Sequence, residues 1–514
     1  MLTVVAMGLI VGCASIRLDV PRTPSYAIDR PEDTDLGRGF GKQLASTAAQ
    51  SGVHLLVSGK EAFAVRAALA ESAQRTLDLQ YYIVTQDATA TLLLYRALRA
   101  AQRGVRVRLL IDDINTGLRD SDLAILARHP HVEVRLFNPF PIRGLSSMAR
   151  VLELLGDAAR LNRRMHNKLW IADNAVAVMG GRNLADTYFE AASERSFGDL
   201  DVLAAGAVVR EISRSFDEYW NSAWAVPIEA VLRTPAAADD VDQALAEMAA
   251  RADRFRESEY ARTLRETGLG LLVHAGQLPL IPANATALYD LPGNLQADVP
   301  DKQGAIFPVL RRIVDGAQHE VILISPYFVP SDRSLELLCG LARRGVRIRV
   351  LTNSLASTDV PVVHAGYARR RPGLLACGVE LYELRPPAAG SPRVRAGLSS
   401  GASLHAKAVV VDRQSIFLGS MNLDPRSKWL NTEVALQIES ATLGEQLAGV
   451  FEEATAPDQV FRVRLDDAGN PAGALHWESV EDGRPVRFTS EPLASAWRRI
   501  ITPIMGALTP EELL

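Results

Sequence analysis

Two stretches of this chain carry the same polar residues, at the same spacing, on an otherwise apolar background. They read MHNKLWIADNAVAVMGGRN over residues 165–183 and LHAKAVVVDRQSIFLGSMN over residues 404–422. Because residues i and i+2 of a strand face the same way, the histidine and the lysine of each copy are expected to project together. These residues are His166 and Lys168 in the first copy, and His405 and Lys407 in the second. A single His-x-Lys pair is usually structural, but two copies that also agree at Asp, Gly and Asn indicate a function.

Each copy continues as a predicted hairpin that returns to its own histidine. Asp173 and Asp412 begin a short turn, and they are expected to fix that turn rather than to touch a substrate. The returning strand leads to Gly180-Gly181 in the first copy and to Gly419-Ser420 in the second. Asn183 and Asn422 then follow their histidines at the same distance along the chain. The hairpin is therefore expected to bring each asparagine back beside its histidine.

The segments before the two copies also repeat. Within residues 77–112, LDLQYYIV, TATLLLYRALRAAQRG and VRVRLLID predict a strand, a helix and a strand. The same order appears within residues 321–352 as VILISPYFV, SLELLCGLARRG and VRIRVLT. A strand-helix-strand unit favours parallel pairing with a right-handed crossover. The sequence therefore predicts a duplicated α/β fold, in which each domain is a mixed β-sheet flanked by helices.

The repeat also sets the expected domain boundaries. We expect a first domain over residues 46–225, a helical and loop insert over 226–300, and a second domain over 301–514. Within the insert, VDQALAEMAARADRFRESEYARTLRE predicts helix and LIPANATALYDLPGN predicts loop and turn. Near the C-terminus, LHWESVEDGRPVRF predicts a hairpin that turns at Asp482-Gly483. The final helical segment is expected to pack on the second domain, and a position on a membrane surface is the alternative.

The N-terminus is a short apolar segment, MLTVVAMGLIVGCAS, that is too brief to span a bilayer as a helix. Its residues 10–13 resemble a bacterial lipobox, in which the cysteine is acylated and becomes the mature N-terminus. Residues 1–12 are then a signal and residues 13–45 a tether, with a lipid anchor at Cys13. This resemblance implies a membrane-associated protein of the bacterial cell envelope that faces the periplasm. No Lys or Arg precedes the apolar run, so a frayed hydrophobic tail is the alternative.

Composition narrows the classes of partner and site. The net charge is −4 and charged residues make up 23% of the chain, which argues against a nucleic-acid binder. Three cysteines are too few for a disulfide scaffold and show no metal-ligand spacing. Cys339 and Cys377 are expected to be buried, inert thiols, with a single bond between them as the alternative.

The repeated polar residues suit transfer at a phosphodiester. Lysines and asparagines can hold the non-bridging oxygens and stabilise the charge on phosphorus. One neutral imidazole attacks, and the other, protonated, donates to the leaving oxygen. A covalent phosphohistidine then passes its group to water or to an alcohol. The competing interpretation is a metal site of two imidazoles and a carboxylate, but the neighbouring lysines oppose a metal cation and favour an anion.

At these residues the chain resembles the phospholipase D superfamily, whose signature H-x-K-x(4)-D followed by G-[GS]-x-N is present twice. The resemblance covers residues from about 50 to 220 and from about 300 to 514, and it implies two α/β domains packed face to face around one active site, with no metal and no cofactor. It makes His166 the nucleophile and His405 the general acid, although the sequence alone does not break their symmetry. It also points to carboxylates that orient the imidazoles, at Glu433 and at Asp199, for which neighbouring Asp201 is the rival. The expected phosphate-binding and supporting residues are Asn183, Asn422, Ser420, Asp199 and Glu433.

Among the subfamilies, LNRRMHNKLWIADNAVAVMGGRNLADTYF and GSMNLDPRSKWLNTEVAL are most similar to bacterial cardiolipin synthases of the C type. This implies phosphatidyl transfer between phospholipids, with phospholipid substrates and a membrane surface as partners and no nucleic acid. The alternatives are a phospholipase D hydrolase that releases phosphatidic acid, a nuclease of the same superfamily, and a non-catalytic lipid-binding lipoprotein. The apolar loop LFNPFPIRG, with Phe137, Pro139, Phe140 and Ile142, is expected to be packed rather than to admit acyl chains.

Overall fold

The computed structural model describes residues 20–116, 120–140, 158–192, 196–231, 238–295, 306–387, 398, 403–467 and 469–510. The lipobox with Cys13, and Ile142 of the apolar loop, lie outside these residues. Within them, no helix combines the length and the apolar composition that crossing a bilayer requires.

The two predicted strand-helix-strand units are both present. In the first, strands β2 (Thr76–Val84) and β3 (Arg106–Thr116) pair in parallel and are joined by helix α4 (Ala88–Gln102). In the second, β12 (Glu320–Ile324) and β13 (Arg347–Asn353) pair in parallel and are joined by α14 (Asp332–Arg343). Strands β4 (Val132–Phe137) and β14 (Glu380–Leu384) continue the two parallel sets. The predicted duplication of an α/β fold is confirmed.

The motif hairpins follow in each half, as predicted. They are β6 (Leu169–Ala172) with β7 (Val176–Gly180), and β16 (Ala408–Val411) with β17 (Ser415–Gly419). Asp173 and Asp412 have φ of 55° and 51° at the turns, in the left-handed region that a tight hairpin turn requires. The Asp173 carboxylate also accepts hydrogen bonds from the amides of residues 74, 75 and 76. Asp412 does the same with residues 318, 319 and 320, so each aspartate ties its hairpin to the start of the neighbouring strand, β2 or β12.

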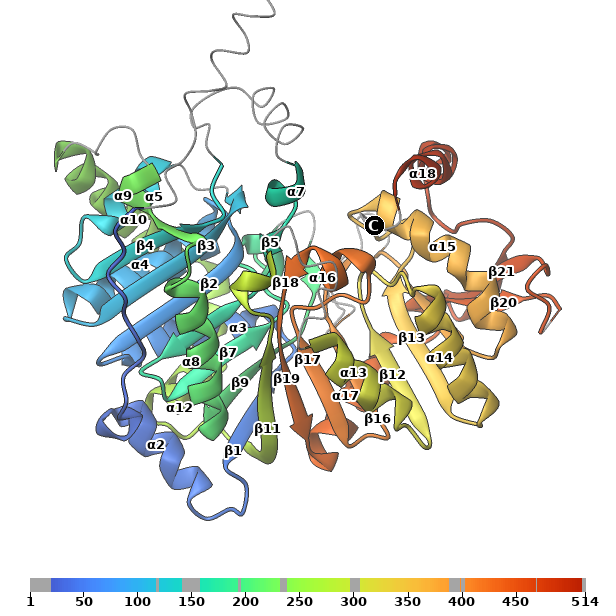
Figure 1. Ribbon diagram of the computed structural model, residues 1–514, viewed down its shortest axis with the longest axis horizontal. Coiled ribbons are helices and arrows are strands. Elements are labelled where there is room, and N and C mark those ends of the chain that lie inside the picture. The colour runs from blue at the N-terminus through green and yellow to red at the C-terminus, as the bar shows by residue number, and fades with distance from the viewer. Residues whose placement is uncertain are drawn as a thin grey trace, which may run out of the picture.

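The two half-sheets continue into one another through a pair of edge strands (Figure 1). The order at the junction is β9 (Asp201–Gly206), β1 (Ser51–Leu56), β11 (Ile281–Tyr289) and β19 (Val434–Glu439), all antiparallel. Strand β11 takes in the second half the place that β1 takes in the first. The interpretation of residues 281–289 as loop was therefore wrong. The strand could not be recognised from the sequence because its few buried positions do not form a strongly apolar pattern. The second structural repeat begins at β11, ahead of residue 301.

The remaining helices lie around this sheet, and the remaining strands extend it at its outer edges. In the first half they are η1 (Pro31–Asp33), α2 (Asp35–Leu44), α3 (Gly59–Ser72), α5 (Asp120–Ala127), α7 (Ala158–Leu161), η2 (Asp186–Tyr188), α8 (Ala207–Trp220), β10 (Ala225–Pro227) and α9 (Ile228–Val231). The insert forms α10 (Ala238–Glu257), α11 (Glu259–Glu266), α12 (Leu269–His274) and η3 (Pro292–Leu295). In the second half they are α13 (Ile306–Asp315), α15 (Pro361–Ala376), α16 (Pro425–Trp429), α17 (Ala441–Ala454), β20 (Val460–Leu465), β21 (Leu475–Glu481), β22 (Arg484–Phe488) and α18 (Ala496–Leu508). One hydrophobic core joins the halves, because α8 and α17 both contribute to it together with the central strands.

The expected tether packs on the first half over the residues that the structure describes. Arg22 donates a hydrogen bond from Nε to the carbonyl oxygen of Ala225 at 2.9 Å. Leu36 and Phe40 on α2 are almost fully buried in the first hydrophobic core. Part of the expected tether is therefore folded, because the short amphipathic helix α2 follows the segment rich in Pro and Asp.

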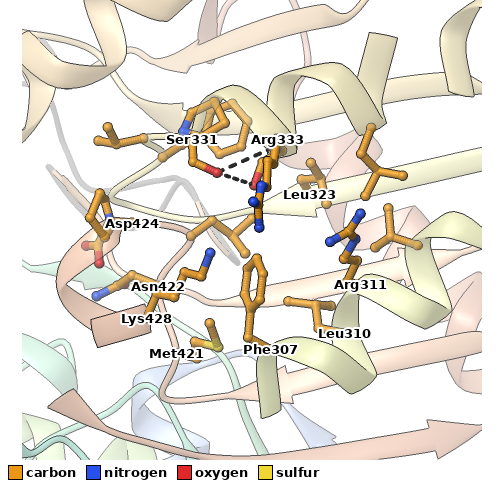
Figure 2. Close-up of a pocket in the computed structure, with 18 of the residues that line it drawn as sticks. Phe307, Leu310, Arg311, Leu323, Ser331, Arg333, Met421, Asn422, Asp424 and Lys428 are labelled. Carbon is orange, nitrogen blue, oxygen red and sulfur yellow. Dashed lines mark hydrogen bonds between the residues drawn. The ribbon is translucent and has the colours of Figure 1, made fainter. Parts of the chain in front are cut away.

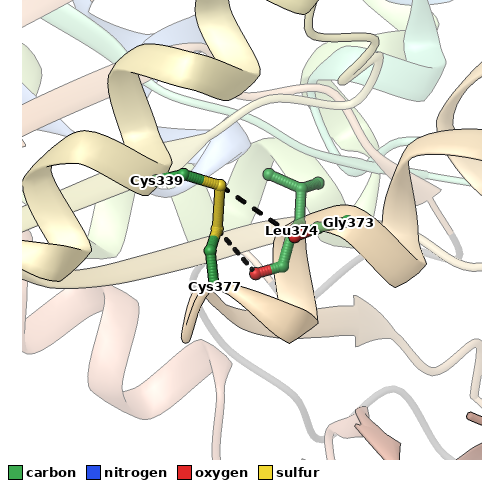
Figure 3. The surroundings of a disulfide bond; sticks show 4 residues. All are labelled: Cys339, Gly373, Leu374 and Cys377. Carbon is green, nitrogen blue, oxygen red and sulfur yellow. Dashed lines mark hydrogen bonds between the residues drawn. A yellow bond between two sulfur atoms is a disulfide. The ribbon is translucent and has the colours of Figure 1, made fainter. Parts of the chain in front are cut away.

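The second half contains a disulfide bond between Cys339 on α14 and Cys377 at the end of α15 (Figure 3). The Cα atoms of the two cysteines are 5.3 Å apart, although 38 residues separate them in the sequence. The expectation of two inert thiols was wrong, and the alternative of a single bond is what the structure contains. Spacing could not reveal this pairing, because it depends on how α14 packs against α15.

Three predictions about the loops and the C-terminus are confirmed. Strands β21 and β22 form the hairpin that turns at Asp482-Gly483, where φ is positive at both residues. In the described part of the apolar loop, Phe137 and Phe140 are buried. Helix α18 packs on α15, where Gly506 lies so close to Ala365 that a larger side chain would collide with it.

Candidate active site

Two short ladders between the halves hold the two histidines. Strand β5 (Arg164–Met165) pairs in parallel with β18 (Asn431–Thr432), and β15 (Ser403–Leu404) pairs in parallel with β8 (Phe197–Gly198). His166 follows β5 directly, and its amide donates to the carbonyl oxygen of Thr432 at 2.9 Å. His405 follows β15 directly, and its amide donates to the carbonyl oxygen of Gly198 at 2.8 Å. Each histidine is therefore positioned by backbone from the opposite half.

The residue after each partner strand is a carboxylate, so the histidine-carboxylate pairs also cross between the halves. Nδ1 of His166 lies 2.9 Å from Oε2 of Glu433, and Nδ1 of His405 lies 2.7 Å from Oδ2 of Asp199. Both carboxylates are fully buried. Asp201, the rival to Asp199, instead forms an ion pair of 2.9 Å with Arg66. The structure thus brings together both predicted histidines and both predicted orienting carboxylates.

The returning hairpin strands support the carboxylates of their own halves. An added side chain at Gly181 would overlap the Asp199 carboxylate, so this position has room for glycine only. At the matching position of the second copy, the hydroxyl of Ser420 donates to Oε2 of Glu433. The Gly-Gly and Gly-Ser variants of the motif therefore place different groups against their carboxylates.

The two lysines lie beside the histidines, in segments between the short ladders and the hairpins. Nζ of Lys168 donates to the carbonyl oxygen of His166, and Nζ of Lys407 donates to that of His405. Lys407 Nζ also lies 3.1 Å from Nδ1 of His405. Both lysines are almost fully buried. The expected proximity of His and Lys is observed, although these residues lie outside the strand ladders.

The two asparagines are buried, and each is fixed in a different way. Oδ1 of Asn183 accepts a hydrogen bond from the amide of Ile83 at 3.0 Å. The amide of Asn422 donates to the hydroxyl of Ser427, while its Oδ1 has no hydrogen-bond partner in the part of the chain that the structure describes. Asp173 and Asp412 stay at the turns and bond the backbone, as expected from the sequence.

Sequence reasoning missed the residues that pack on the imidazoles. Tyr82 contacts His166 edge to face with 4.9 Å between ring centroids, and Tyr188 contacts His405 in the same way at 5.1 Å. Arg182 donates to the carbonyl oxygen of Asp199 at 2.7 Å. Tyr82 belongs to an apolar strand that reads as core, and Arg182 is a variable position of the motif, so no spacing marked either residue.

The electrostatics of the pair His166 and Glu433 favour the neutral imidazole. Burial lowers the pKa of His166 well below its usual value, and the nearby Lys168 and Lys407 lower it further. Burial raises the pKa of Glu433 to about 7, against the opposing influence of Lys168. His166 is therefore poised as a base or nucleophile at neutral pH.

The second pair differs because its carboxylate stays ionised. Burial alone would raise the pKa of Asp199, but His405 and Lys407 together hold it at about 2. Burial and Lys407 lower the pKa of His405, and Asp199 opposes that shift. A proton on His405 is thus supported by a charged partner, which suits a general acid.

The lysines are cations held out of water. Burial lowers the pKa of Lys168 to about 7 and that of Lys407 to about 8. A bound anion would favour their charged forms, so the site is arranged for a negatively charged group. Among the residues that the structure describes, no three His, Cys, Asp or Glu side chains gather as potential metal ligands.

Comparison with known proteins identifies relatives over most of the chain. Residues 67–220 and 310–455 match the family described as "Cardiolipin synthase, PLD-like domain". The chain is 40% identical to cardiolipin synthase C of Escherichia coli K12 over 476 residues, which are 90% of this chain and 96% of the relative. It is 26% identical to a cardiolipin synthase of Geobacillus kaustophilus, over 81% of this chain and 68% of the relative.

A solved structure supports the same fold. The crystal structure of phosphatidylserine synthase from Haemophilus influenzae Rd KW20 aligns with a TM-score of 0.51 and 13% identity, covering 83% of this chain and 91% of that one. This likeness concerns the fold alone. The matches to the family and to its relatives include both motif regions, and on that evidence the chain belongs to the cardiolipin synthase family with phospholipase D-like domains.

Proposed function

We propose that this protein transfers a phosphatidyl group from one phospholipid to the hydroxyl of phosphatidylglycerol, and so makes cardiolipin. The observation that carries the proposal is the pair of crossed histidine-carboxylate contacts with two buried lysines beside them. The 40% identity to cardiolipin synthase C supports the choice of lipid substrates. Transfer to water, which would release phosphatidic acid, uses the same residues and is an outcome of the test below.

The site residues supply each step of the transfer. Neutral His166 attacks phosphorus through Nε2, the bond from phosphorus to the leaving head group breaks, and His405 gives its proton to the leaving oxygen. The phosphatidyl group is then held on His166. His405 next takes the proton of the acceptor hydroxyl, whose oxygen attacks phosphorus while the phosphorus–nitrogen bond breaks. Lys168 and Lys407 offset the charge on the non-bridging oxygens during both steps.

The pKa shifts support the order of the two histidines. His166 faces a carboxyl whose pKa is raised to about 7, whereas His405 faces a carboxylate whose pKa is held at about 2. The more negative partner stabilises an imidazolium better, so His405 is assigned as the acid and His166 as the nucleophile. Asn183, Asn422 and Ser420 are assigned as supporting residues near the phosphate.

We further propose that the protein is anchored through Cys13 in the bacterial cell envelope and faces the periplasm. The disulfide between Cys339 and Cys377 supports an oxidising compartment. Helix α18 supports a position at a membrane surface, since it turns a row of large apolar side chains to solvent. These are Trp497, Ile500, Ile504 and Leu508, with exposed fractions of 69%, 62%, 50% and 80%.

Product analysis tests the proposed function. The purified protein is incubated with vesicles of phosphatidylglycerol, phosphatidylethanolamine or both, and the products are identified by mass spectrometry. Cardiolipin is expected whenever phosphatidylglycerol is present, and the His166→Ala variant should form none. Phosphatidic acid as the sole product in every mixture would reject the transferase in favour of the hydrolase.

A further inference from the structure

A pocket of about 340 Å³ opens in the second half beside the second motif (Figure 2). Its walls come from α13, α14 and the segment from Met421 to Trp429 that contains α16. Most of the lining is apolar, with Phe307, Leu310 and Leu338 among its side chains. A pocket of this size and character is in the range of small-molecule sites in proteins.

Three cations converge on this apolar lining. Arg311 comes from α13, Arg333 from α14 and Lys428 from α16, and Figure 2 shows their charged ends directed toward the same space. Within the described residues, none of the three forms an ion pair. Nζ of Lys428 lies instead over the rings of Phe307 and Trp429, at 4.1 and 4.4 Å. Burial lowers the pKa of Lys428, and Arg333 and Arg311 lower it further, as expected for like charges held near one another.

The other end of the pocket reaches the catalytic motif. Asn422 lines it, and its Oδ1 is buried without a hydrogen-bond partner among the described residues. Asp424 lines it too and accepts from the amide of Ser427 at 2.7 Å. Burial raises the pKa of Asp424 to about 7, and the charge of Glu433 in the active site raises it further. The pocket therefore joins the three cations to a residue of the second motif.

Transfer between two phospholipids requires a second anionic site. The donor phosphate reacts and occupies the two lysines beside the histidines. An acceptor phosphatidylglycerol carries a phosphate of its own, which does not react and must be held elsewhere while the glycerol hydroxyl reaches phosphorus. Cations next to an apolar surface match a phosphate joined to acyl chains.

We propose that this pocket binds the acceptor phospholipid, with its phosphate at Arg311, Arg333 and Lys428 and its hydroxyl-bearing head group directed past Asn422 toward the active site. The proposal rests on the phosphatidyl-transfer function and names where one of its two substrates is held.

Direct binding tests the pocket without turnover. His166→Ala protein is titrated with monomeric dihexanoyl phosphatidylglycerol, with dihexanoyl phosphatidylcholine and with inorganic phosphate. Adding R311Q and R333Q should weaken phosphatidylglycerol binding by about tenfold, since two charge-assisted contacts are lost. The matched control is the His166→Ala protein with R312Q and R343Q, which remove the same charge from α13 and α14 outside the pocket lining. This control should bind phosphatidylglycerol as tightly as the His166→Ala protein does. A Leu337→Trp variant, which fills the apolar part, should weaken lipid binding while the three cations remain.

Equal binding by the pocket and control variants would overturn the proposal, and so would inorganic phosphate binding as tightly as the lipid. A kinetic experiment distinguishes failure of the pocket proposal from failure of the proposed function. In the active protein, R311Q with R333Q should raise the KM for phosphatidylglycerol as acceptor, and transfer to glycerol, which carries no phosphate, should be unchanged. Undiminished use of phosphatidylglycerol would reject the pocket alone, whereas no transfer to either acceptor by the unmodified protein would reject the proposed function.

Discussion

The two motif copies place the same residues in different electrostatic surroundings. Ser420 donates to the carboxyl of Glu433, whereas Gly181 leaves its space to the carboxylate of Asp199. The pKa of Glu433 is raised to about 7 and that of Asp199 is held at about 2. A duplicated motif can therefore divide the roles of nucleophile and acid, because the residues around each copy differ.

These shifts predict a bell-shaped dependence of kcat/KM on pH. The acid limb should lie below pH 6.5, because burial and the two lysines lower the pKa of His166 and it takes up a proton only there. The rate should decline at higher pH because His405, the assigned acid, loses its proton, and it should fall further through about 7 and 8 as Lys168 and Lys407 lose theirs. Initial rates in mixed micelles across this range check the profile. Lys407→Arg should lower the rate and make the decline above pH 8 less steep, because residue 407 then loses no proton there while Lys168 still does. A rate that stays flat up to pH 9 would contradict the assignment.

Asp173 and Asp412 are expected to matter for stability and not for chemistry. Each accepts hydrogen bonds from three consecutive backbone amides, so replacement by alanine should lower the free energy of unfolding by about 2–4 kcal/mol. Denaturant unfolding measures this loss, and kcat per folded molecule should stay close to that of the unmodified protein. Replacement by asparagine keeps one acceptor oxygen and should lower the free energy of unfolding by less. A variant with unchanged stability and abolished turnover would show that the carboxylate acts on the substrate.

At the level of elements, the shortest strands determine the site. The ladders β5 with β18 and β8 with β15 are two residues long, yet each fixes a histidine beside a carboxylate of the other half. Such ladders depend on the packing of the two halves and leave no periodic signal in the sequence. For this reason the pairing of His166 with Glu433, and of His405 with Asp199, required the structure.

Helix α18 is predicted to bind membranes through its row of exposed apolar side chains, which includes Trp497 and Ile500. Trp497→Ser combined with Ile500→Ser should weaken binding to vesicles about tenfold or more, because two large apolar side chains no longer enter the lipid. Co-sedimentation with vesicles that contain phosphatidylglycerol measures the effect. The control is Leu271→Ser on α12, a residue that is 78% exposed and lies on the insert, and it should bind normally. Activity on monomeric short-chain lipid should be unchanged in all variants, and equal vesicle binding by the double variant would contradict the role of α18.

On the scale of the whole molecule, the sequence predicted what repeats and missed what joins the repeats. The strand-helix-strand units and the motif hairpins have strong apolar periodicity, and both are present as expected. Strand β11, which unites the two half-sheets, has a weaker pattern and depends on tertiary contacts. Helix α2, which packs where a tether was expected, is short and follows a segment rich in Pro and Asp. The disulfide between Cys339 and Cys377 likewise follows from helix packing. Candidate site residues could be predicted one by one, but their partners across the two halves could not.

The central claim is that both halves form one site. In this site His166 carries the phosphatidyl group, and His405 donates a proton to the leaving oxygen and later accepts one from the acceptor hydroxyl. The most direct test is to react the His405→Ala variant with a phospholipid whose head group is p-nitrophenol, a leaving group that needs no proton. The reaction is quenched, the protein is digested, and the modified peptide is located by mass spectrometry. The phosphatidyl group is expected on His166, since that step needs no acid and the variant lacks the base for the next one. A modification at another residue, or its presence in a protein that also carries His166→Ala, would contradict the account.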